Sequence, residues 1–462
     1  MKRGRSALFG TDGVRGRANH HPMTVEVAVA LGKALAMVLE REPGKKRVVV
    51  GKDTRLSCYM FENALIAGLT SMGVETLMVG PLPTPGVAFI TRAYRANAGI
   101  MISASHNPFH DNGIKIFTSD GYKLPDEVEE EIAKIVATNA FYNIKTDAHN
   151  VGRNKRIHDA DGRYIEFAKA TFPKKQTFEG MKIVLDCANG AAHRVAPLVF
   201  QELGADVLVF GNEPDGININ ANCGALHPSL VQKEVIEHSA DVGISLDGDG
   251  DRVVMVDERG QVVDGDTILA ILALYLHERG ELPRNRVVGT VMTNLGVIKT
   301  LECNGIEVIR SQVGDRYVLS EMQKHQAILG GEQSGHLVFL DYNTTGDGIV
   351  SSLQVLKVMK ETGRSLSALS ATIEKYPQSL VNVPVVSKRP LEGVDSIQKE
   401  IREAEGALGG CGRVLIRYSG TEPLCRVLVE GSAKIDVNKL AIRLAKLIEK
   451  ELGEKCVESL DT

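Results

Sequence analysis

A strand–helix pattern that occurs three times constrains the fold of this chain most strongly. Each copy opens with a basic residue and a β-branched run that ends in Gly, Asp or Asn, and these runs are KRVVVGKDTR (46–55), MKIVLDCANG (181–190) and NRVVGTVMTN (285–294). A helical segment follows, and then a second strand after glycine, at residues 73–80, 204–211 and 305–314. A third short strand then enters a polar loop, after residues 98–102, 240–246 and 325–329. Coincidence among generic strands is the weaker interpretation, because the strands recur in the same order.

Continuous apolar strands that alternate with helices are typical of βαβ units, in which helices cover both faces of a sheet. We therefore predict an α/β chain with three related α/β domains, at residues 1–165, 166–263 and 264–372. The remainder, residues 373–462, has a strand that contains proline and a closing helix from Asp436, which indicates a C-terminal α+β domain.

The loops that follow the third strands carry the most unusual polar residues of the chain. Ligands of open α/β sheets bind beyond the carboxyl ends of the strands. We therefore expect the three α/β domains to offer one loop each to a central cleft.

Composition excludes several classes of function. The 462 residues have a net charge of −4 and no basic block, so nucleic acid is not an expected partner. The seven cysteines are scattered without a C-x-x-C pair, which indicates reduced thiols. The first residues lack the apolar core of a signal peptide, and the most apolar helix candidates are too short or interrupted by charge to span a bilayer. We expect a cytoplasmic protein with no membrane partner.

The first strand-end loop contains SASHNP, in which Ser105 precedes His106. Neighbours on an extended segment point to opposite sides, and no G-x-S-x-G elbow is present, so a Ser-His hydrolase pair is poorly supported. A simple turn is the rival interpretation, because Asn107-Pro108 is a good turn initiator. Lys115 follows a second turn and could act as an acid or base, as a fixed charge beside an anion, or as a solvated surface lysine.

The second loop, LDGDGDR, places Asp247, Asp249 and Asp251 at alternate positions with glycine between them. Three carboxylates so close would repel one another without a cation, and oxygen ligands suit Mg²⁺ or Ca²⁺. An EF-hand is excluded, because its sixth position needs glycine and is Arg252 here, and because the flanks are strand-like. Arg252 could steady a phosphate beside the ion. An acidic turn without an ion is the alternative.

The third loop, GGEQSGH, combines Glu332, Ser334 and His336, a set that suits recognition of a polyol or an amino group. A polar loop without a ligand is a fair alternative.

A fourth loop, RYSGTEPLCR in the last domain, supplies guanidinium groups, hydroxyls and backbone N–H groups that could hold a phosphate. The residues are Arg417, Ser419, Gly420, Thr421 and Arg426. An ordinary Ser-Gly turn with surface arginines is the alternative here, but the density of donors favours an anion site.

Together these loops make the chain similar to the α-D-phosphohexomutase superfamily over nearly its full length. The motifs that carry the resemblance are FGTDGVRG (9–16), SASHNP (103–108), DGDGDR (247–252), GEQSGH (331–336) and RYSGTEP (417–423). The first two, with VGDRYV (313–318), look most like the bacterial phosphoglucosamine mutases of this superfamily.

The resemblance implies four domains around a central cleft and a Mg²⁺-dependent isomerase with one Mg²⁺ per chain. That enzyme interconverts glucosamine 6-phosphate and glucosamine 1-phosphate through a phosphoserine and a 1,6-bisphosphate, and its product feeds peptidoglycan precursors. Glucosamine or glucose 1,6-bisphosphate is then expected as an activator. The resemblance leaves open a phosphomannomutase/phosphoglucomutase, a non-catalytic phosphosugar-binding protein, and a monomer or a homodimer.

The resemblance also assigns roles by position. Ser105 would be the phosphoserine, and its oxygen would join the three aspartates around Mg²⁺. Glu332 and Ser334 would contact sugar hydroxyls, and the fourth loop would hold the distal phosphate. Arg15 and Lys115 would lie near the transferred group, with Lys115 as the preferred general base.

Overall fold

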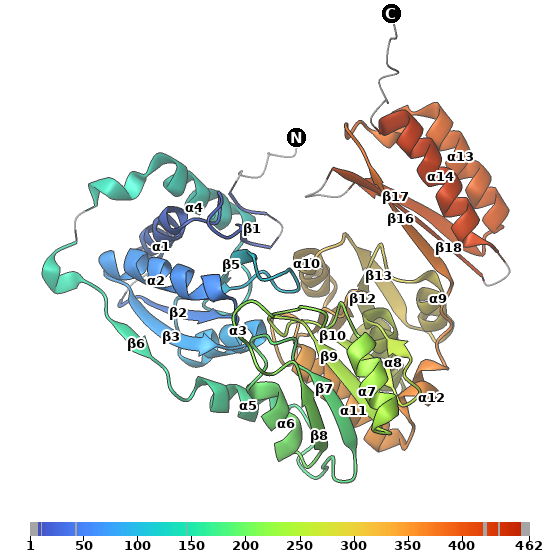
Figure 1. The fold of residues 1–462 in the computed structure, drawn as a ribbon, viewed down its shortest axis with the longest axis horizontal. Coiled ribbons are helices and arrows are strands. Elements are labelled where there is room, and N and C mark those ends of the chain that lie inside the picture. The colour runs from blue at the N-terminus through green and yellow to red at the C-terminus, as the bar shows by residue number, and fades with distance from the viewer. Residues whose placement is uncertain are drawn as a thin grey trace, which may run out of the picture. The chain divides into compact units, whose positions relative to one another are not determined.

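The computed structural model (Figure 1) describes residues 8–10, 12–41, 44–144, 146–418, 423–432 and 435–453. Its packing divides the chain into two compact units. Unit 1 comprises Met1–Met292 and Gly305–Thr372, and unit 2 comprises Thr293–Asn304 and Ile373–Thr462.

The first sheet of unit 1 has six strands in the order β1-β5-β4-β2-β3-β6. The strands are β1 (Val14–Arg17), β2 (Arg47–Lys52), β3 (Glu75–Pro81), β4 (Ala98–Ile102), β5 (Asp111–Thr118) and β6 (Asn154–Arg156). The helices are α1 (Val25–Leu39), α2 (Leu56–Ser71), α3 (Thr84–Ala93), α4 (Asp126–Thr138) and α5 (Ala160–Ala170), with 3-10 turns η1 (Ala140–Asn143) and η2 (Ala148–Asn150). Helices α1, α2 and α4 pack together on one face, over Val48 and Val50 of β2. Helix α3 covers the other face, where its Val87 packs against Gly51.

The second sheet has the order β11-β10-β9-β7-β8. Its strands are β7 (Lys182–Asp186), β8 (Asp206–Phe210), β9 (Val242–Leu246), β10 (Val253–Asp257) and β11 (Val262–Val263), and its helices are α6 (Val195–Glu202) and α7 (Ser229–Glu237). The third sheet has the order β13-β12-β14-β15. Its strands are β12 (Arg286–Thr290), β13 (Glu307–Ser311), β14 (Leu329–Gly331) and β15 (Leu337–Phe339). The helices of this part are α8 (Gly265–Glu278), α9 (Leu295–Cys303), α10 (Asp315–His325), α11 (Gly348–Thr362) and α12 (Leu366–Ser370), with the 3-10 turn η3 (Pro283–Asn285).

The three sheets share one arrangement, which confirms the three related α/β parts. In each, the first predicted strand lies between the second and the third, and both pairings are parallel. The third strand then turns back into an antiparallel partner, which is β5, β10 or β15. The loops after β4, β9 and β14 are therefore equivalent positions, at the carboxyl ends of central parallel strands.

Unit 2 confirms the predicted α+β character of the C-terminal part. Its antiparallel sheet has the order β16-β18-β17, with β16 (Gln378–Pro384), β17 (Gly412–Tyr418) and β18 (Leu424–Gly431). The 3-10 turn η4 (Leu391–Gly393) and helices α13 (Asp395–Leu408) and α14 (Val437–Leu452) complete it. Asp436 caps α14 by accepting a hydrogen bond from the Lys439 N–H at 3.0 Å. Leu444 and Ile448 of α14 enter a core with Val427 and Val429 of β18.

The predicted domain boundaries stay a prediction. Each of the four predicted segments holds one sheet, but unit 1 joins three sheets in one body, and α9 packs with unit 2. The boundary at residue 165 falls inside α5.

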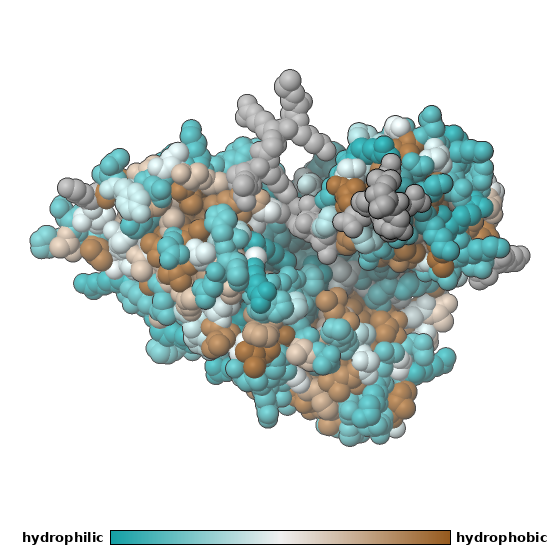
Figure 2. Space-filling model, turned by 45° about the horizontal axis from the view of Figure 1, so that its top comes forward, coloured by the Kyte–Doolittle hydropathy of each residue, from teal (hydrophilic) through white to brown (hydrophobic). Residues whose placement is uncertain are grey.

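The surface in Figure 2 is largely hydrophilic, with hydrophobic side chains in separate small groups. In the part of the chain that the structure describes, no helix combines the length and the apolar character needed to cross a membrane.

Candidate active site

Ser105 lies in the loop between β4 and β5, here called the serine loop (residues 103–110), and only 1% of it is exposed. Its backbone is left-handed, with a φ of 53°. The Ser105 N–H donates to Ser103 Oγ at 2.9 Å, and Ser103 Oγ donates to the buried Asp53 at 2.6 Å. Ser103 therefore caps the backbone of the serine loop.

The expectation that Ser105 and His106 point to opposite sides is wrong. Ser105 Oγ lies 3.3 Å from His106 Nδ1, because a left-handed residue turns the chain where an extended one would not. Burial, with Arg252 and Arg15 nearby, lowers the pKa of His106 to about 3. Its imidazole is therefore neutral at physiological pH.

The aspartate loop (residues 247–252) joins β9 to β10 and brings its three carboxylates together in the interior. One oxygen from each of Asp247, Asp249 and Asp251 can be chosen so that all lie within 4.8 Å of one another. Asp247 Oδ2 accepts a hydrogen bond from Ser105 Oγ at 2.5 Å. The serine loop and the aspartate loop, which come from different sheets, thus meet as predicted for a shared cleft.

The donor set of this loop fits a hard divalent cation such as Mg²⁺. Burial, together with repulsion from Asp251 and Asp249, raises the pKa of Asp247 well above its usual range. Asp249 Oδ1 is buried and, among the described residues, accepts no hydrogen bond. Buried, crowded carboxylate oxygens without donors are the ligands that such a cation would satisfy.

Lys115 on β5 is 2% exposed, so it is not a solvated surface lysine. Its Nζ lies 2.9 Å from Asp249 Oδ2, 3.2 Å from Asp251 Oδ2 and 3.4 Å from Asp12 Oδ2. Burial lowers its pKa, but these three carboxylates outweigh burial and raise the pKa well above its usual range. The ammonium group stays charged, which favours the fixed-charge role over the general-base role.

Arg15 and Arg252 add two more cations to this cluster. Arg15 pairs with Asp12, and Arg252 Nε lies 3.8 Å from Asp251 Oδ1. The Nε atoms of both arginines are buried and, in the described part of the chain, donate no hydrogen bond. Each guanidinium therefore has a donor that a phosphoryl oxygen could use.

The glutamate loop (residues 332–336) packs directly on the aspartate loop. Residues Arg252 and His336 pair in a β-bridge, and the Val253 N–H donates to the Gly335 carbonyl at 3.1 Å. Gly335 has a φ of 86°, and a Cβ there would lie 2.0 Å from the Val253 carbonyl oxygen, so only glycine allows this approach.

The three residues predicted to bind sugar differ in their surroundings. Glu332 is buried and accepts a hydrogen bond from the Gly314 N–H at 2.9 Å, whereas Ser334 is exposed. His336 accepts from the Gly346 N–H at 3.2 Å and lies 3.7 Å from Asp251. Sugar binding by these residues stays a prediction.

Sequence reasoning missed a second layer of charged residues. The Lys123 ammonium bridges the carboxylates of Asp12 and Asp315, and Thr84 Oγ1 donates to Asp249 Oδ2 at 2.6 Å. Asp12 lies within the motif FGTDGVRG and Asp315 within VGDRYV, so these two motifs could have identified both aspartates. Neither Thr84 nor Lys123 stands in a distinctive pattern.

The predicted phosphate loop lies in unit 2 and is described only in part. Arg417 and Arg426 face each other across β17 and β18, as register partners. The remaining predicted residues, Ser419, Gly420 and Thr421, lie outside the described residues.

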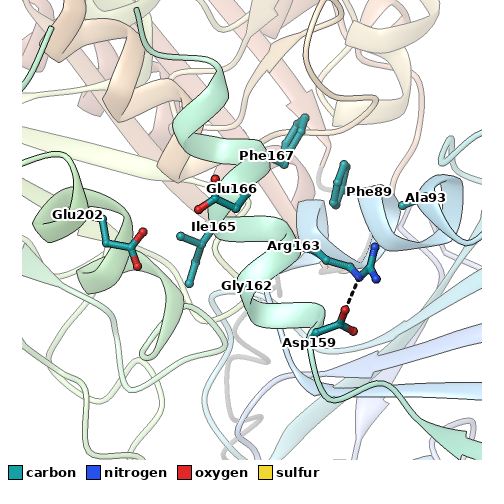
Figure 3. A pocket seen from close by; sticks show the side chains of 9 residues that line it. All are labelled: Phe89, Ala93, Asp159, Gly162, Arg163, Ile165, Glu166, Phe167 and Glu202. Atoms are coloured by element: carbon teal, nitrogen blue, oxygen red, sulfur yellow. Dashed lines mark hydrogen bonds and ion pairs between the residues drawn. The ribbon is translucent and has the colours of Figure 1, made fainter. Parts of the chain in front are cut away.

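A groove of about 700 Å³ between α3 and α5 is a rival site (Figure 3). Its Phe89 and Phe167 stack on each other at 4.4 Å, and its Arg163 pairs with Asp159 at 2.7 Å on an exposed face. The groove does not have the buried, crowded charges of the three strand-end loops, so those loops define the better candidate.

The fold therefore combines three equivalent sheets with a buried serine that donates a hydrogen bond to Asp247, one of three clustered aspartates. Models of the phosphoglucomutase/phosphomannomutase family match domain I at residues 6–143, domain II at 162–260, domain III at 264–376 and the C-terminal domain at 380–447. The chain belongs to this family of enzymes, which are isomerases that transfer a phosphoryl group within a sugar phosphate.

The chain is also similar to individual proteins, by sequence or by structure. A protein of Chlamydia trachomatis serovar L2 named phosphoglucosamine mutase is 64% identical over 98% of this chain and 99% of its own length. A phosphoglucomutase/phosphomannomutase family protein of Burkholderia thailandensis has a TM-score of 0.79 at 22% identity, covering 96% of this chain and 97% of its own. The Aspergillus fumigatus N-acetylphosphoglucosamine mutase, solved with GlcNAc-6P and magnesium, has a TM-score of 0.69 at 18% identity, covering 97% of each chain. These two structures show the fold.

Proposed function

We propose that this chain is a Mg²⁺-dependent phosphoglucosamine mutase that interconverts glucosamine 6-phosphate and glucosamine 1-phosphate. The observation that carries the proposal is the 2.5 Å hydrogen bond from Ser105 Oγ to Asp247, one of the three clustered aspartates. It puts a nucleophilic oxygen beside a cation site, which is what a phosphoryl carrier needs. The 64% identity to the chlamydial phosphoglucosamine mutase supports the choice of substrate.

In the proposed reaction, Ser105 carries a phosphoryl group in the resting enzyme. A sugar hydroxyl attacks phosphorus, the P–Oγ bond to Ser105 breaks, and a 1,6-bisphosphate forms. The hydroxyl proton passes to a neighbouring base, and Ser105 Oγ leaves as an oxyanion. In the second half, Ser105 Oγ takes the phosphoryl group from the other sugar oxygen, which recovers the proton.

The positive side chains stabilise the charge that moves in these steps. Lys115, Arg15 and Arg252 surround the site and remain cationic, so they can hold the phosphoryl oxygens without exchanging a proton. Mg²⁺ held by the aspartate triad and the Ser105 oxygen would supply further neutralisation of the phosphoryl group. His106 is neutral and lies 3.3 Å from Ser105 Oγ, but a pKa of about 3 makes its imidazole a weak base.

Two loops are assigned to the parts of the ligand. We assign Glu332, Ser334 and His336 to the sugar. The distal phosphate is assigned to Arg417, Ser419, Gly420, Thr421 and Arg426. The Aspergillus protein solved with GlcNAc-6P and magnesium supports a phosphosugar ligand together with Mg²⁺.

The proposal extends to activation, location and assembly. Glucosamine or glucose 1,6-bisphosphate would phosphorylate Ser105 and so activate the enzyme. We place the enzyme in the cytoplasm, because the structure gives Cys58, Cys187, Cys223, Cys303, Cys411 and Cys425 as free thiols, which suits a reducing compartment. A homodimer is the assembly proposed.

Intact mass and a coupled assay test the proposal together. The wild type should carry one phosphoryl group, lose it with phosphatase, and regain it with glucose 1,6-bisphosphate. Activity on glucosamine 6-phosphate should follow the phosphorylated fraction. The Ser105→Ala variant should carry no phosphoryl group and show no activity. Full activity of Ser105→Ala would overturn the phosphoserine mechanism.

The same assay distinguishes the proposed mutase from the second candidate, a phosphomannomutase/phosphoglucomutase. The match to the phosphoglucomutase/phosphomannomutase family favours this second candidate. Catalytic efficiencies on glucosamine, glucose and mannose 6-phosphates are compared in one preparation. Higher efficiency on glucose or mannose 6-phosphate would replace the proposed substrate. A phosphorylated wild type that binds these sugars but converts none would instead indicate a phosphosugar-binding protein.

A further inference from the structure

The backbone of the serine loop is held by two side chains that have no part in the mechanism above. Arg55 Nη2 donates to the carbonyls of Ser105 and Asn107, in both cases at 2.8 Å. Asn220 Nδ2 donates to the same two carbonyls, at 2.9 Å and 3.0 Å. With the Ser105 N–H bound to Ser103, every backbone polar group of Ser105 has a partner.

Arg55 and Asn220 reach these carbonyls from different sheets. Arg55 follows β2 of the first sheet, is fully buried, and pairs with Asp53 at 2.8 Å. Asn220 belongs to the loop between β8 and α7 of the second sheet, which also carries the aspartate loop. Its own N–H donates to the Ala188 carbonyl at 2.9 Å. Asn220 therefore connects the phosphoryl carrier to the part of the chain that holds the cation site.

The aspartate loop packs closely against both Ser105 and Asn220. A Cβ at Gly248, between Asp247 and Asp249, would lie 2.6 Å from the Ser105 carbonyl oxygen and 2.8 Å from Asn220 Nδ2. The amide of Asn220 thus lies where the serine loop and the aspartate loop meet. Its hydrogen bonds hold Ser105 in the left-handed conformation, in which Oγ lies 2.5 Å from Asp247.

We propose that Asn220 is a positioning residue that, together with Arg55, holds Ser105 in register with the aspartate triad for phosphoryl transfer. The inference rests on the proposed phosphoserine mechanism. Phosphoryl transfer depends on in-line placement, and a displacement of about 1 Å costs about 100-fold in rate. Loss of the Asn220 amide should therefore lower kcat and leave KM nearly unchanged, because the hydrogen bonds that Asn220 donates within the described residues go to Ser105, Asn107 and Ala188 and not to Glu332, Ser334 or His336.

Asn220→Gly and Asn220→Asp are the test variants, because both residues accept the left-handed φ of 57° at this position. Aspartate keeps the shape but replaces the amide donor by an oxygen that repels the two carbonyls. Asn222→Gly is the matched control: the same residue type lies two positions away, exposed, with a φ of 56°.

Four measurements are made on the full chain after treatment with glucose 1,6-bisphosphate. Both Asn220 variants should lose about 10- to 100-fold in kcat, with a KM within about threefold of the wild type. The Asn222→Gly control should keep the kcat and the KM of the wild type. Added Mn²⁺ should broaden the ³¹P resonance of the phosphoserine less in these variants, because the phosphorus to metal distance grows. Hydrogen exchange should accelerate in the peptide covering the serine loop, and the melting temperature should stay within a few degrees of the control.

The outcomes separate the two proposals. A wild type without a phosphoserine resonance would overturn the proposed function itself. A phosphorylated wild type whose Asn220 variants keep its kcat and its Mn²⁺ broadening would overturn the positioning role alone. Equal losses in the Asn222→Gly control would assign the effect to general loosening of the loop and would also overturn it.

Discussion

Replacing Lys115 by methionine removes a buried cation that lies within 3.4 Å of three carboxylates. Methionine fills a similar volume without charge, so the variant leaves Asp12, Asp249 and Asp251 with less compensation. Breaking a buried ion pair by removing one partner costs about 3–5 kcal/mol. In EDTA, we expect the free energy of unfolding of unit 1 to fall by about this amount, which lowers its melting temperature by roughly 4–7 °C.

Mg²⁺ should reverse most of this loss. A divalent cation at the triad supplies the positive charge that Lys115 no longer provides, so the variant should bind Mg²⁺ more tightly than the wild type. Stabilisation by a bound ligand grows as RT ln(1 + [L]/Kd). The Mg²⁺-induced rise in melting temperature should therefore be larger in Lys115→Met than in the wild type.

Differential scanning calorimetry in EDTA and in millimolar Mg²⁺ measures both effects. Lys169→Met is the control, because Lys169 also pairs with two carboxylates, Glu166 and Glu202, but at the surface. Lys169→Met should lower the free energy of unfolding by less than about 1 kcal/mol, and its melting temperature should respond to Mg²⁺ as that of the wild type does. An equal loss of stability in EDTA and in Mg²⁺ for Lys115→Met would refute the claim that Lys115 and the cation share the same carboxylates.

Three further predictions concern single residues. Asp249→Asn should lower kcat about 1,000-fold in the coupled assay and reduce the Mg²⁺-induced rise in melting temperature, and unchanged activity would exclude Asp249 as a ligand. Burial raises the pKa of Asp347 to about 6, so the folded state keeps a proton that the unfolded chain releases near pH 4. Stability should therefore fall by about 3 kcal/mol as pH rises from 4 to 6 and then level off, and this contribution should be absent in calorimetry of Asp347→Asn, which can still bond to Tyr164. Gly32→Ala puts a Cβ 2.7 Å from the Leu65 carbonyl oxygen, where α1 and α2 cross. The substitution should lower the free energy of unfolding by about 1–3 kcal/mol. An unchanged melting temperature would show that the two helices can separate without loss of stability.

The α/β class and the equivalence of the three sheets followed from the sequence alone. Strands that are buried on both faces must be continuously apolar, so β2, β7 and β12 are visible as runs of β-branched residues. The aspartate triad was equally visible, because alternation with glycine is a local pattern. Both features depend only on residues that are neighbours in the sequence, so they can be predicted without the tertiary structure.

Only the tertiary structure decided what each strand-end residue faces. Lys115 could have been a surface lysine, a base or a fixed charge, and its three carboxylate neighbours come from distant parts of the chain. The approach of His106 to Ser105 depends on a left-handed φ that packing imposes on a non-glycine residue, which no local pattern predicts. Asn220 and Arg55 converge on the same carbonyls although they are far apart in sequence. Local patterns specify which elements form and which residues can carry charge, whereas charge compensation and backbone strain depend on burial and on long-range contacts, which exist only once the sheets have packed together.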